Sequence, residues 1–446
     1  MDNTLFMYIT GDNGASAEGT IHGAWSAPSF QNGIPEDPEW LLDHMDDFGT
    51  ARCENHYNLA WAWALDSPFQ WMKQVASHFG GTRNAMAVQW PARISDAGGL
   101  RTQFHHVVDV MPTLLAAAGV SMPTAVNGLQ QLPVDGVSML YAMDGADGAS
   151  TRTTQYFEMF GNRAIYHDGW IASCFHGRVP WNRFGMVPFD GPQEKWELYN
   201  IANDFSQGVD LAEKNPEKLA ELLALFDSEA KRNNVYPLRE PGSTLGMTVV
   251  PPENLGGLKK MTYTTDHIRM PERSVVNLKN CSFRITAEVE VSSSTRSGVI
   301  ACQGGNMAGW TLYLNDDGCP VYHYNWMGHD HYIATSLVPL TAGHHEIVVD
   351  FVYDGGFGVG GHAVLLVDAI PVAHVRVERT VPIVFSMSGE SFDIGMDTGA
   401  PVGFYPHVYR CSAVIHGVTL ERLSEPSPDI AALIIEGEFR ASLATQ

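Results

Sequence analysis

The stretch FMYITGDNGASAEG, residues 6–19, decides how the first half of the chain is interpreted. The apolar run Leu5–Thr10 predicts a buried β-strand, and the polar run Gly11–Gly14 follows it directly. Ligands of a parallel sheet gather where its strands end, and Asp12 and Asn13 offer the hard oxygen donors that calcium or magnesium prefers. Asp-Asn-Gly is also typical of an ordinary turn, so a turn and a cation site both remain open.

A second informative stretch is DSPFQWMKQVASHFGG, residues 66–81, which predicts an amphipathic helix. Ser67 and Gln70 match a capping box, and Pro68 suits the first helical position. Apolar residues recur at helical spacing and predict one buried stripe: Phe69, Met72, Ala76 and Phe79.

Strand and helix patterns then alternate along the first half of the chain. A strand is expected at residues 86–90, a helix at 105–118, short strands between 155 and 210, and a helix that begins at Asn215-Pro216. This alternation predicts an α/β fold with helices on the faces of a mixed or parallel sheet.

The second half has a different pattern. Residues 283–291 alternate apolar and polar side chains, and many short runs of this kind predict a β-sandwich. We therefore expect a domain at residues 1–233, a Pro- and Gly-rich linker at 234–261, and an all-β domain at 262–446. Aromatic residues of the last domain could stack on sugar rings or pack inside the sandwich: Tyr322, Tyr324 and Trp326.

Composition excludes several classes of function. The 446 residues carry 27 Lys+Arg against 50 Asp+Glu, a net charge of −23, which disfavours nucleic acid and anionic membranes as partners. With 45% hydrophobic residues the chain is expected to fold. Its six cysteines form no C-x-x-C pair, and the first residues lack the basic start of a signal peptide, which leaves bacterial cytoplasm and periplasm both open.

Cationic and imidazole side chains supply further candidates. Lys73 and Arg83 together would suit a sulfate or phosphate group, although either one alone is typical of a solvated surface. His105 and His106 with Asp109 could bind a metal or act as an acid–base pair, and a polar helix N-terminus explains them equally well.

Taken together, these runs resemble a known family. Residues 6–19, 55–84, 105–120, 158–170 and 196–207 are similar to the C-terminal part of bacterial arylsulfatases. These are formylglycine-dependent sulfatases of the alkaline phosphatase-like superfamily, and the resemblance runs from residue 1 to about 230. The runs GWTLYL, FVYDGG and ERTVPIVFSM resemble the β-sandwich that many of these enzymes carry.

The resemblance implies roles for four residues. Asp12 and Asn13 would be two of the protein ligands of a divalent cation, usually calcium, and Lys73 would touch the substrate sulfate. Arg83 would be a supporting residue near the turn, with a weaker claim to bind substrate. A hard cation and a fixed ammonium would offset the sulfate charge.

One departure from the family is decisive. Its nucleophile is a formylglycine made in a C/S-x-P-x-R motif, and this motif does not occur in the sequence. Cys174 and Arg178 have the right separation, but His176 stands where proline is required, so we interpret Cys174 as a strand residue. The formylglycine, the other metal ligands and the leaving-group histidine are expected only in an N-terminal segment that is missing here.

The leading hypothesis is therefore a calcium-dependent arylsulfatase-type hydrolase of sulfate esters, either small molecules or sulfated glycans, that lacks its nucleophile and is inactive alone. A partial sheet should also expose apolar strands. The alternative is a non-catalytic protein, either a carbohydrate-binding protein that uses the β-sandwich or a partner subunit completed by an N-terminal sulfatase segment.

Overall fold

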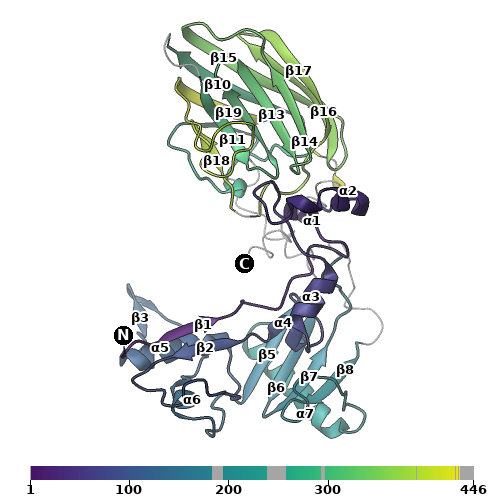
Figure 1. Cartoon of the computed structure of the whole chain (residues 1–446), viewed down its shortest axis with the longest axis vertical. Helices are drawn as coiled ribbons and strands as arrows, with labels where there is room; N and C mark the ends of the chain where they lie inside the picture. Colours follow the sequence, from purple (N-terminus) through teal and green to yellow (C-terminus); the bar gives the residue numbers. More distant parts are fainter. Residues whose placement is uncertain are drawn as a thin grey trace. The chain divides into compact units, whose positions relative to one another are not determined.

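The computed structural model describes residues 2–182, 194–238, 258–292, 297–387 and 389–426, with 428, 429 and 431. The chain is a mixed α/β fold with several antiparallel sheets (Figure 1). It divides into two compact units: the first is Met1–Ala17 with Ala60–Glu240, and the second is Glu18–Leu59 with Pro241–Gln446. In the described part of the chain, no helix is long and apolar enough to cross a membrane.

The first unit begins with the predicted strand β1 (Phe6–Ile9). It pairs antiparallel with β2 (Met86–Gln89), and within the described ranges these two strands form a sheet of their own. The prediction of strands at both places is confirmed, but the prediction that the first is buried is wrong. Phe6 and Tyr8 are 58% and 57% exposed, because a sheet this small leaves its apolar side chains open to solvent.

The prediction of a helix over residues 66–81 is also wrong. A helix, α3 (Leu59–Asp66), ends where the predicted one begins, and turns follow up to the short α4 (Phe79–Thr82). Trp71 and Gln74 have φ values of 66° and 78°, which a right-handed helix cannot accommodate. The apolar side chains of Met72, Val75 and Phe79 are nevertheless buried, so the spacing reflects tertiary packing rather than helix.

A larger antiparallel sheet of the first unit has the strand order β5-β6-β7-β8. One face of this sheet is covered by helix α7 (Pro216–Arg232), which buries Leu222 and Phe226 against Ile165 and Leu198. The predicted strands and both later helices are thus confirmed, but the prediction of a mixed or parallel sheet is wrong, because every pair of named strands described in the first unit runs antiparallel. The elements are β5 (Thr154–Met159), β6 (Asn162–His167), β7 (Trp170–Cys174), β8 (Trp196–Asn200), η2 (Val107–Asp109), α5 (Val110–Ala118), α6 (Leu140–Asp144), β3 (Ala125–Val126) and β4 (Leu129–Gln130).

The second unit is built from antiparallel strands, as the period-two pattern predicted. One sheet has the order β17-β16-β15-β10-β19-β9 and another has the order β14-β13-β12-β11-β18. Ile285, Trp310 and Phe351 from both sheets share one buried core. The strands are β9 (Lys260–Tyr263), β10 (Phe283–Val291), β11 (Gly298–Gly304), β12 (Gly309–Leu314), β13 (Pro320–Trp326), β14 (Asp330–Thr335), β15 (Gly343–Tyr353), β16 (Val359–Val367), β17 (Ile370–Arg379), β18 (Phe392–Ile394) and β19 (Val414–Arg422), with η3 at Glu272–Ser274.

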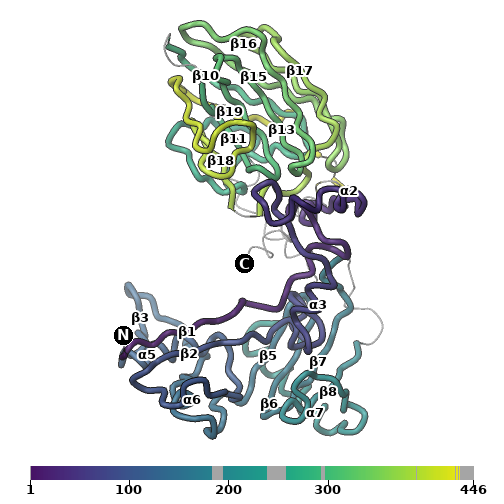
Figure 2. Tube along the Cα trace, viewed as in Figure 1, coloured from purple at the N-terminus to yellow at the C-terminus, as the bar shows by residue number. Residues whose placement is uncertain are grey.

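Glu18–Leu59 belongs to this second unit and not to the domain expected at residues 1–233 (Figure 2). It carries α1 (Ala27–Gln31), α2 (Pro38–Asp43) and η1 (Met45–Asp47). The Asn32 side chain donates to the Val384 carbonyl at 2.8 Å and accepts from the Ile383 and Val384 amides at 2.8 and 3.0 Å. Of the linker expected at 234–261, residues 239–257 lie outside the described residues.

The shared core of the second unit makes a stability prediction. Phe351 is buried and stacks on Phe283 with ring centroids 4.8 Å apart, so Phe351→Ala should lower the unfolding free energy by about 3–5 kcal/mol. The matched control is Val352→Ala, because Val352 is 63% exposed on the other face of the same strand and should change stability by less than about 0.5 kcal/mol. Chemical denaturation of the full chain measures both, and equal effects would contradict the assigned core.

Candidate functional site

The loop that carries Asp12 and Asn13 is fixed to the region around Lys73 by two backbone–backbone hydrogen bonds and one bond from a backbone amide to a side chain. The Lys73 amide donates to the Ala15 carbonyl at 3.0 Å, and the Gly14 amide donates to the Gly81 carbonyl at 3.2 Å. The Ala15 amide donates to Asp66 Oδ1 at 2.8 Å. The structure therefore brings together two segments that lie some 60 positions apart in the sequence.

Two glycines make this contact possible. A Cβ atom on Gly14 would lie 1.6 Å from the Gly80 carbonyl oxygen and 3.1 Å from the Lys73 amide nitrogen. A Cβ atom on Gly80 would in turn lie 2.1 Å from the Trp71 carbonyl oxygen. Because no other residue fits at these distances, the Gly residues of the two segments are required by close packing of backbone on backbone.

The side chains of the predicted site residues differ in burial. Asp12 is exposed, whereas Asn13 and Lys73 are half-buried. With the Asn84 amide oriented by its hydrogen bonds, its nitrogen lies 3.0 Å from the Asn13 carbonyl oxygen and its oxygen 3.3 Å from the Asn13 amide. The backbone of Asn13 is thus held while its side chain stays available.

Asp12 and Asn13 offer the type of oxygen ligand that a hard cation binds, but two residues are too few to complete its coordination. Carboxylate and amide oxygens are suitable ligands for calcium, which takes about six to eight oxygens. Among the described residues, the group of three or more acidic, His or Cys side chains close enough for one ion is Cys302, Asp393 and Asp397, which lies in the second unit. Asp12 and Asn13 alone could supply only part of such a ligand set, and their role as cation ligands stays a prediction.

The Cys302, Asp393 and Asp397 group is occupied by the protein's own donors. Asp393 accepts from the Thr398 hydroxyl at 2.8 Å, and Asp397 accepts from the Tyr405 hydroxyl at 2.7 Å. Both carboxylates are buried and hold the loop that follows β18. This arrangement explains the cluster as a structural one.

Asp66 is a site residue that sequence reasoning missed. Burial raises the pKa of its carboxyl to about 6, although the hydrogen bond from the Ala15 amide acts in the opposite direction. Its Oδ2 atom is buried without a hydrogen-bond partner among the described residues. The sequence offered no signal, because an Asp before Ser-Pro is typical of a helix start and not of a side chain that fixes a distant loop.

Arg83 has its own aromatic environment. Its guanidinium carbon lies 4.1 Å from the ring centroid of Phe205, 5.2 Å from that of Phe79 and 5.4 Å from that of Phe69. Burial lowers the pKa of this group. These cation–π contacts account for Arg83 as an anchor of the turn, and its role in substrate binding stays a prediction.

Three histidines of the first unit, His78, His105 and His106, have protein partners. His78 is buried and contacts Glu197 at 3.1 Å. His106 caps the helix start that Asp109 completes, and His105 Nδ1 lies 3.1 Å from Asp109 Oδ2. Burial alone would raise the pKa of Asp109, but hydrogen bonds from His105 and Arg152 outweigh it and hold the pKa well below its usual range. The helix N-terminus is thus the correct interpretation of this group.

Cys174 is a buried strand residue, as predicted. Burial raises the pKa of its thiol to about 12, so the reactive thiolate is scarce at neutral pH.

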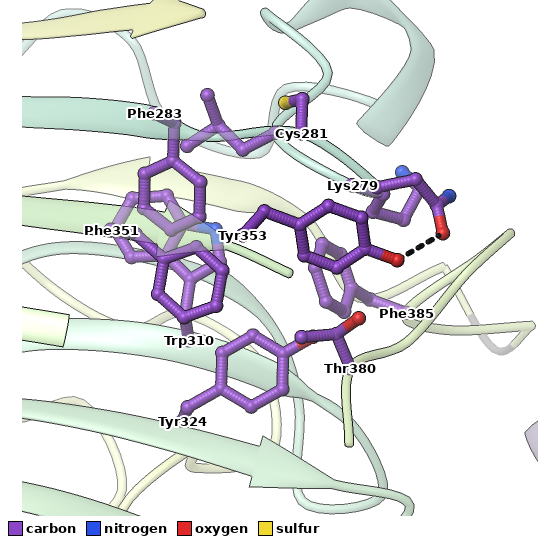
Figure 3. A pocket seen from close by; sticks show the side chains of 11 residues that line it. Lys279, Cys281, Phe283, Trp310, Tyr324, Phe351, Tyr353, Thr380 and Phe385 are labelled. Carbon is purple, nitrogen blue, oxygen red and sulfur yellow. Dashed lines mark hydrogen bonds between the residues drawn. The ribbon is translucent and has the colours of Figure 1, made fainter. Parts of the chain in front are cut away.

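The second unit offers no aromatic face at the predicted place. Tyr322, Tyr324 and Trp326 are all buried, so of the two alternatives they pack inside the fold and do not offer faces for sugar rings. A cavity at one end of the core is lined by Trp310, Tyr353 and further aromatic side chains (Figure 3). Its volume of about 10 Å³ has room for about one water molecule and no larger ligand.

Comparison with known proteins finds a sequence relative named as a sulfatase. No family model matches the chain. It is 25% identical over 225 residues to an uncharacterized sulfatase of Schizosaccharomyces pombe, a match that covers 50% of this chain and 37% of the relative. The resemblance to sulfatases is thus confirmed, and the chain spans well under half the length of that relative.

Solved structures give similar but weaker matches. A Bacteroides thetaiotaomicron 6S-sulf protein from a glycosaminoglycan-metabolism locus is 18% identical with a TM-score of 0.33, covering 52% of this chain and 39% of that one. A protein solved with its substrate D-glucosamine-2-N,6-O-disulfate is 17% identical with a TM-score of 0.26, covering 35% and 30%. At these TM-scores the superpositions do not establish a shared fold, and the sequence match carries the resemblance.

The raised pKa of Asp66 predicts a pH effect. Its folded value of about 6 lies above the unfolded value of about 3.9, so the folded state binds the proton more tightly and stability falls as the pH rises from about 4 through 6. Asp66→Asn should remove this decline and keep an acceptor for the Ala15 amide. The decline is measured as the unfolding free energy of each variant between pH 4 and 7. Asp147→Asn is the control, because Asp147 is exposed. Parallel curves for wild type and Asp66→Asn would contradict the assignment.

The depressed pKa of Asp109 predicts the opposite sign. Its contribution to stability is fully present above about pH 4 and is lost as the pH falls toward the folded pKa. Asp109→Asn should remove this acid sensitivity and cost about 3–5 kcal/mol at pH 7, because Arg152 is left buried without its counter-charge. Asp144→Asn, in an exposed pair with Arg93, should cost less than about 1 kcal/mol. Equal losses of unfolding free energy for Asp109→Asn and Asp144→Asn, measured by urea unfolding, would refute this assignment.

Proposed function

We propose that this chain is part of a calcium-dependent, arylsulfatase-type hydrolase of sulfate esters and is inactive by itself. The observation that carries the proposal is the loop of Asp12 and Asn13 packed directly on the backbone of Lys73. In this proposal the first unit is a portion of an alkaline phosphatase-like catalytic domain, and the second unit is a β-sandwich appended to it.

The chain's own residues would bind and orient the sulfate. The Lys73 ammonium, carried on a residue whose backbone amide donates to the Ala15 carbonyl, would neutralise a sulfate oxygen and stabilise the charge that develops as sulfur is transferred. Asp12 and Asn13 would supply part of the ligand set of a calcium ion, which when bound would polarise the sulfate oxygens. The nucleophile would come from a formylglycine outside this sequence, since C/S-x-P-x-R is absent from it.

The exposed apolar surface of the first unit supports a complementing polypeptide. Phe6 and Tyr8 on β1 and Met86 on β2 are exposed, although large apolar side chains of this kind usually pack against another layer. We propose that a sulfatase N-terminal segment covers these strands and contributes the remaining cation ligands. The substrate would be a small sulfate ester or a sulfated glycan.

The test is a complementation assay. The full chain is mixed or co-expressed with a sulfatase N-terminal segment that carries formylglycine, and hydrolysis of 4-nitrophenyl sulfate is followed with and without calcium. We expect no turnover by the chain alone, calcium-dependent turnover by the complex, and a loss of about 10²–10³-fold in Lys73→Ala. Lys195→Ala is the control, because Lys195 is a solvent-exposed lysine of the same unit. A wild-type rate in Lys73→Ala, or turnover by the chain alone, would refute the proposal.

A further inference from the structure

Three aromatic rings gather in the first unit, one of them on Trp71, two positions before Lys73 in the same turns. The rings of Trp71 and Phe175 stack with centroids 4.0 Å apart and planes 22° from parallel. The ring of Trp181 is 16° from parallel to that of Trp71, with centroids 6.5 Å apart. We call these three residues the aromatic stack. It joins the turns that carry Lys73 to the segment that follows β7.

The aromatic stack is not part of a hydrophobic core. All three rings are half-buried, whereas their chain neighbours Met72 and Cys174 are fully buried. Of the described residues, those that form the buried clusters of the first unit do not include these rings. Packing of the core therefore gives no reason for three large aromatic side chains at this place.

The backbone around the aromatic stack is fixed by polar contacts. Arg178, which stands between Phe175 and Trp181 in the sequence, donates from Nη1 to Gln74 Oε1 at 2.7 Å. The Gln74 carbonyl accepts from Asn162 Nδ2 at 3.1 Å. Trp71 and Gln74 both hold left-handed φ values on either side of Lys73, and such conformations persist where the surroundings determine them and cluster at ligand sites. The turns that carry Trp71 and Lys73 are therefore joined by hydrogen bonds to β6 and to the segment that carries Phe175 and Trp181.

We propose that the aromatic stack binds the ring that carries the sulfate group, an aryl or pyranose ring, next to Lys73. This inference rests on the proposed function and names the subsite for the leaving group. Flat apolar ring faces stack favourably on aromatic side chains. The net charge of the chain is −23, so an anionic ester is repelled at long range and must be held by local contacts. In this proposal the uncharged aromatic stack attracts the ring of the ester, and the Lys73 ammonium attracts its sulfate group.

The test is a binding experiment on the full chain that needs no turnover. Ligand-observed NMR titrations compare 4-methylumbelliferyl sulfate with uncharged 4-methylumbelliferyl glucoside. Trp71→Gly removes the ring and suits the left-handed backbone of this position, so we expect about tenfold weaker binding of both ligands. Phe175→Leu should weaken both as well. Trp63→Ala is the control, because Trp63 is an exposed tryptophan of α3 in the same unit.

Lys73→Ala separates this inference from the proposed function. We expect Lys73→Ala to weaken binding of the sulfate ester and to leave binding of the glucoside unchanged. If Lys73→Ala binds each ligand as tightly as wild type does, the sulfate role of Lys73 is refuted and the ring subsite is not. The ring subsite is overturned if the wild-type chain binds neither ligand, or if Trp71→Gly and Phe175→Leu, shown to be folded by circular dichroism, bind both as wild type does. If Trp71→Gly does not fold, Phe175→Leu and Trp181→Ala decide by the same criterion.

Discussion

The contact between Gly14 and Gly80 is the constraint on which the candidate site depends. It allows two backbone segments to touch without side chains between them, and the hydrogen bonds of Ala15 with Lys73 and Asp66 then fix their register. A larger residue at Gly14 would push the two segments apart, and one at Gly80 would meet the Trp71 carbonyl oxygen and disturb the turns of the second segment. The positions of Asp12, Asn13 and Lys73 therefore follow from one close approach of main chains.

The frame around this contact is held by buried polar groups whose partners come from distant parts of the first unit. Gln207 accepts from the Phe79 amide at 2.8 Å and donates to the Ser173 hydroxyl at 3.2 Å, which joins the turn region to strand β7. Such bonds stabilise modestly when made and cost more when one partner is lost. The site thus gains rigidity from polar contacts, while its apolar strands β1 and β2 stay open to solvent.

Periodicity was sufficient for part of this structure. The alternation in residues 283–291 predicted β10 and its buried face, and the apolar spacing after Pro216 predicted α7, because each element packs one regular face on a core. It failed over residues 66–81, where Met72 and Phe79 are buried by tertiary contacts and the φ values of Trp71 and Gln74 interrupt any helix. Asp12, Asn13 and Lys73 were predicted from a family resemblance, whereas Asp66 and the aromatic stack depend on contacts between distant segments that spacing does not encode.

In the function proposed here, the arrangement around Gly14 and Lys73 is one part of a larger sulfatase centre. The most direct test is the intact mass and N-terminal peptide map of the protein as its native cell makes it. We predict a longer species whose upstream peptides include C/S-x-P-x-R with its first residue converted to formylglycine, or a second chain with that segment that co-purifies. A species that begins at Met1 and purifies without such a partner would contradict the claim.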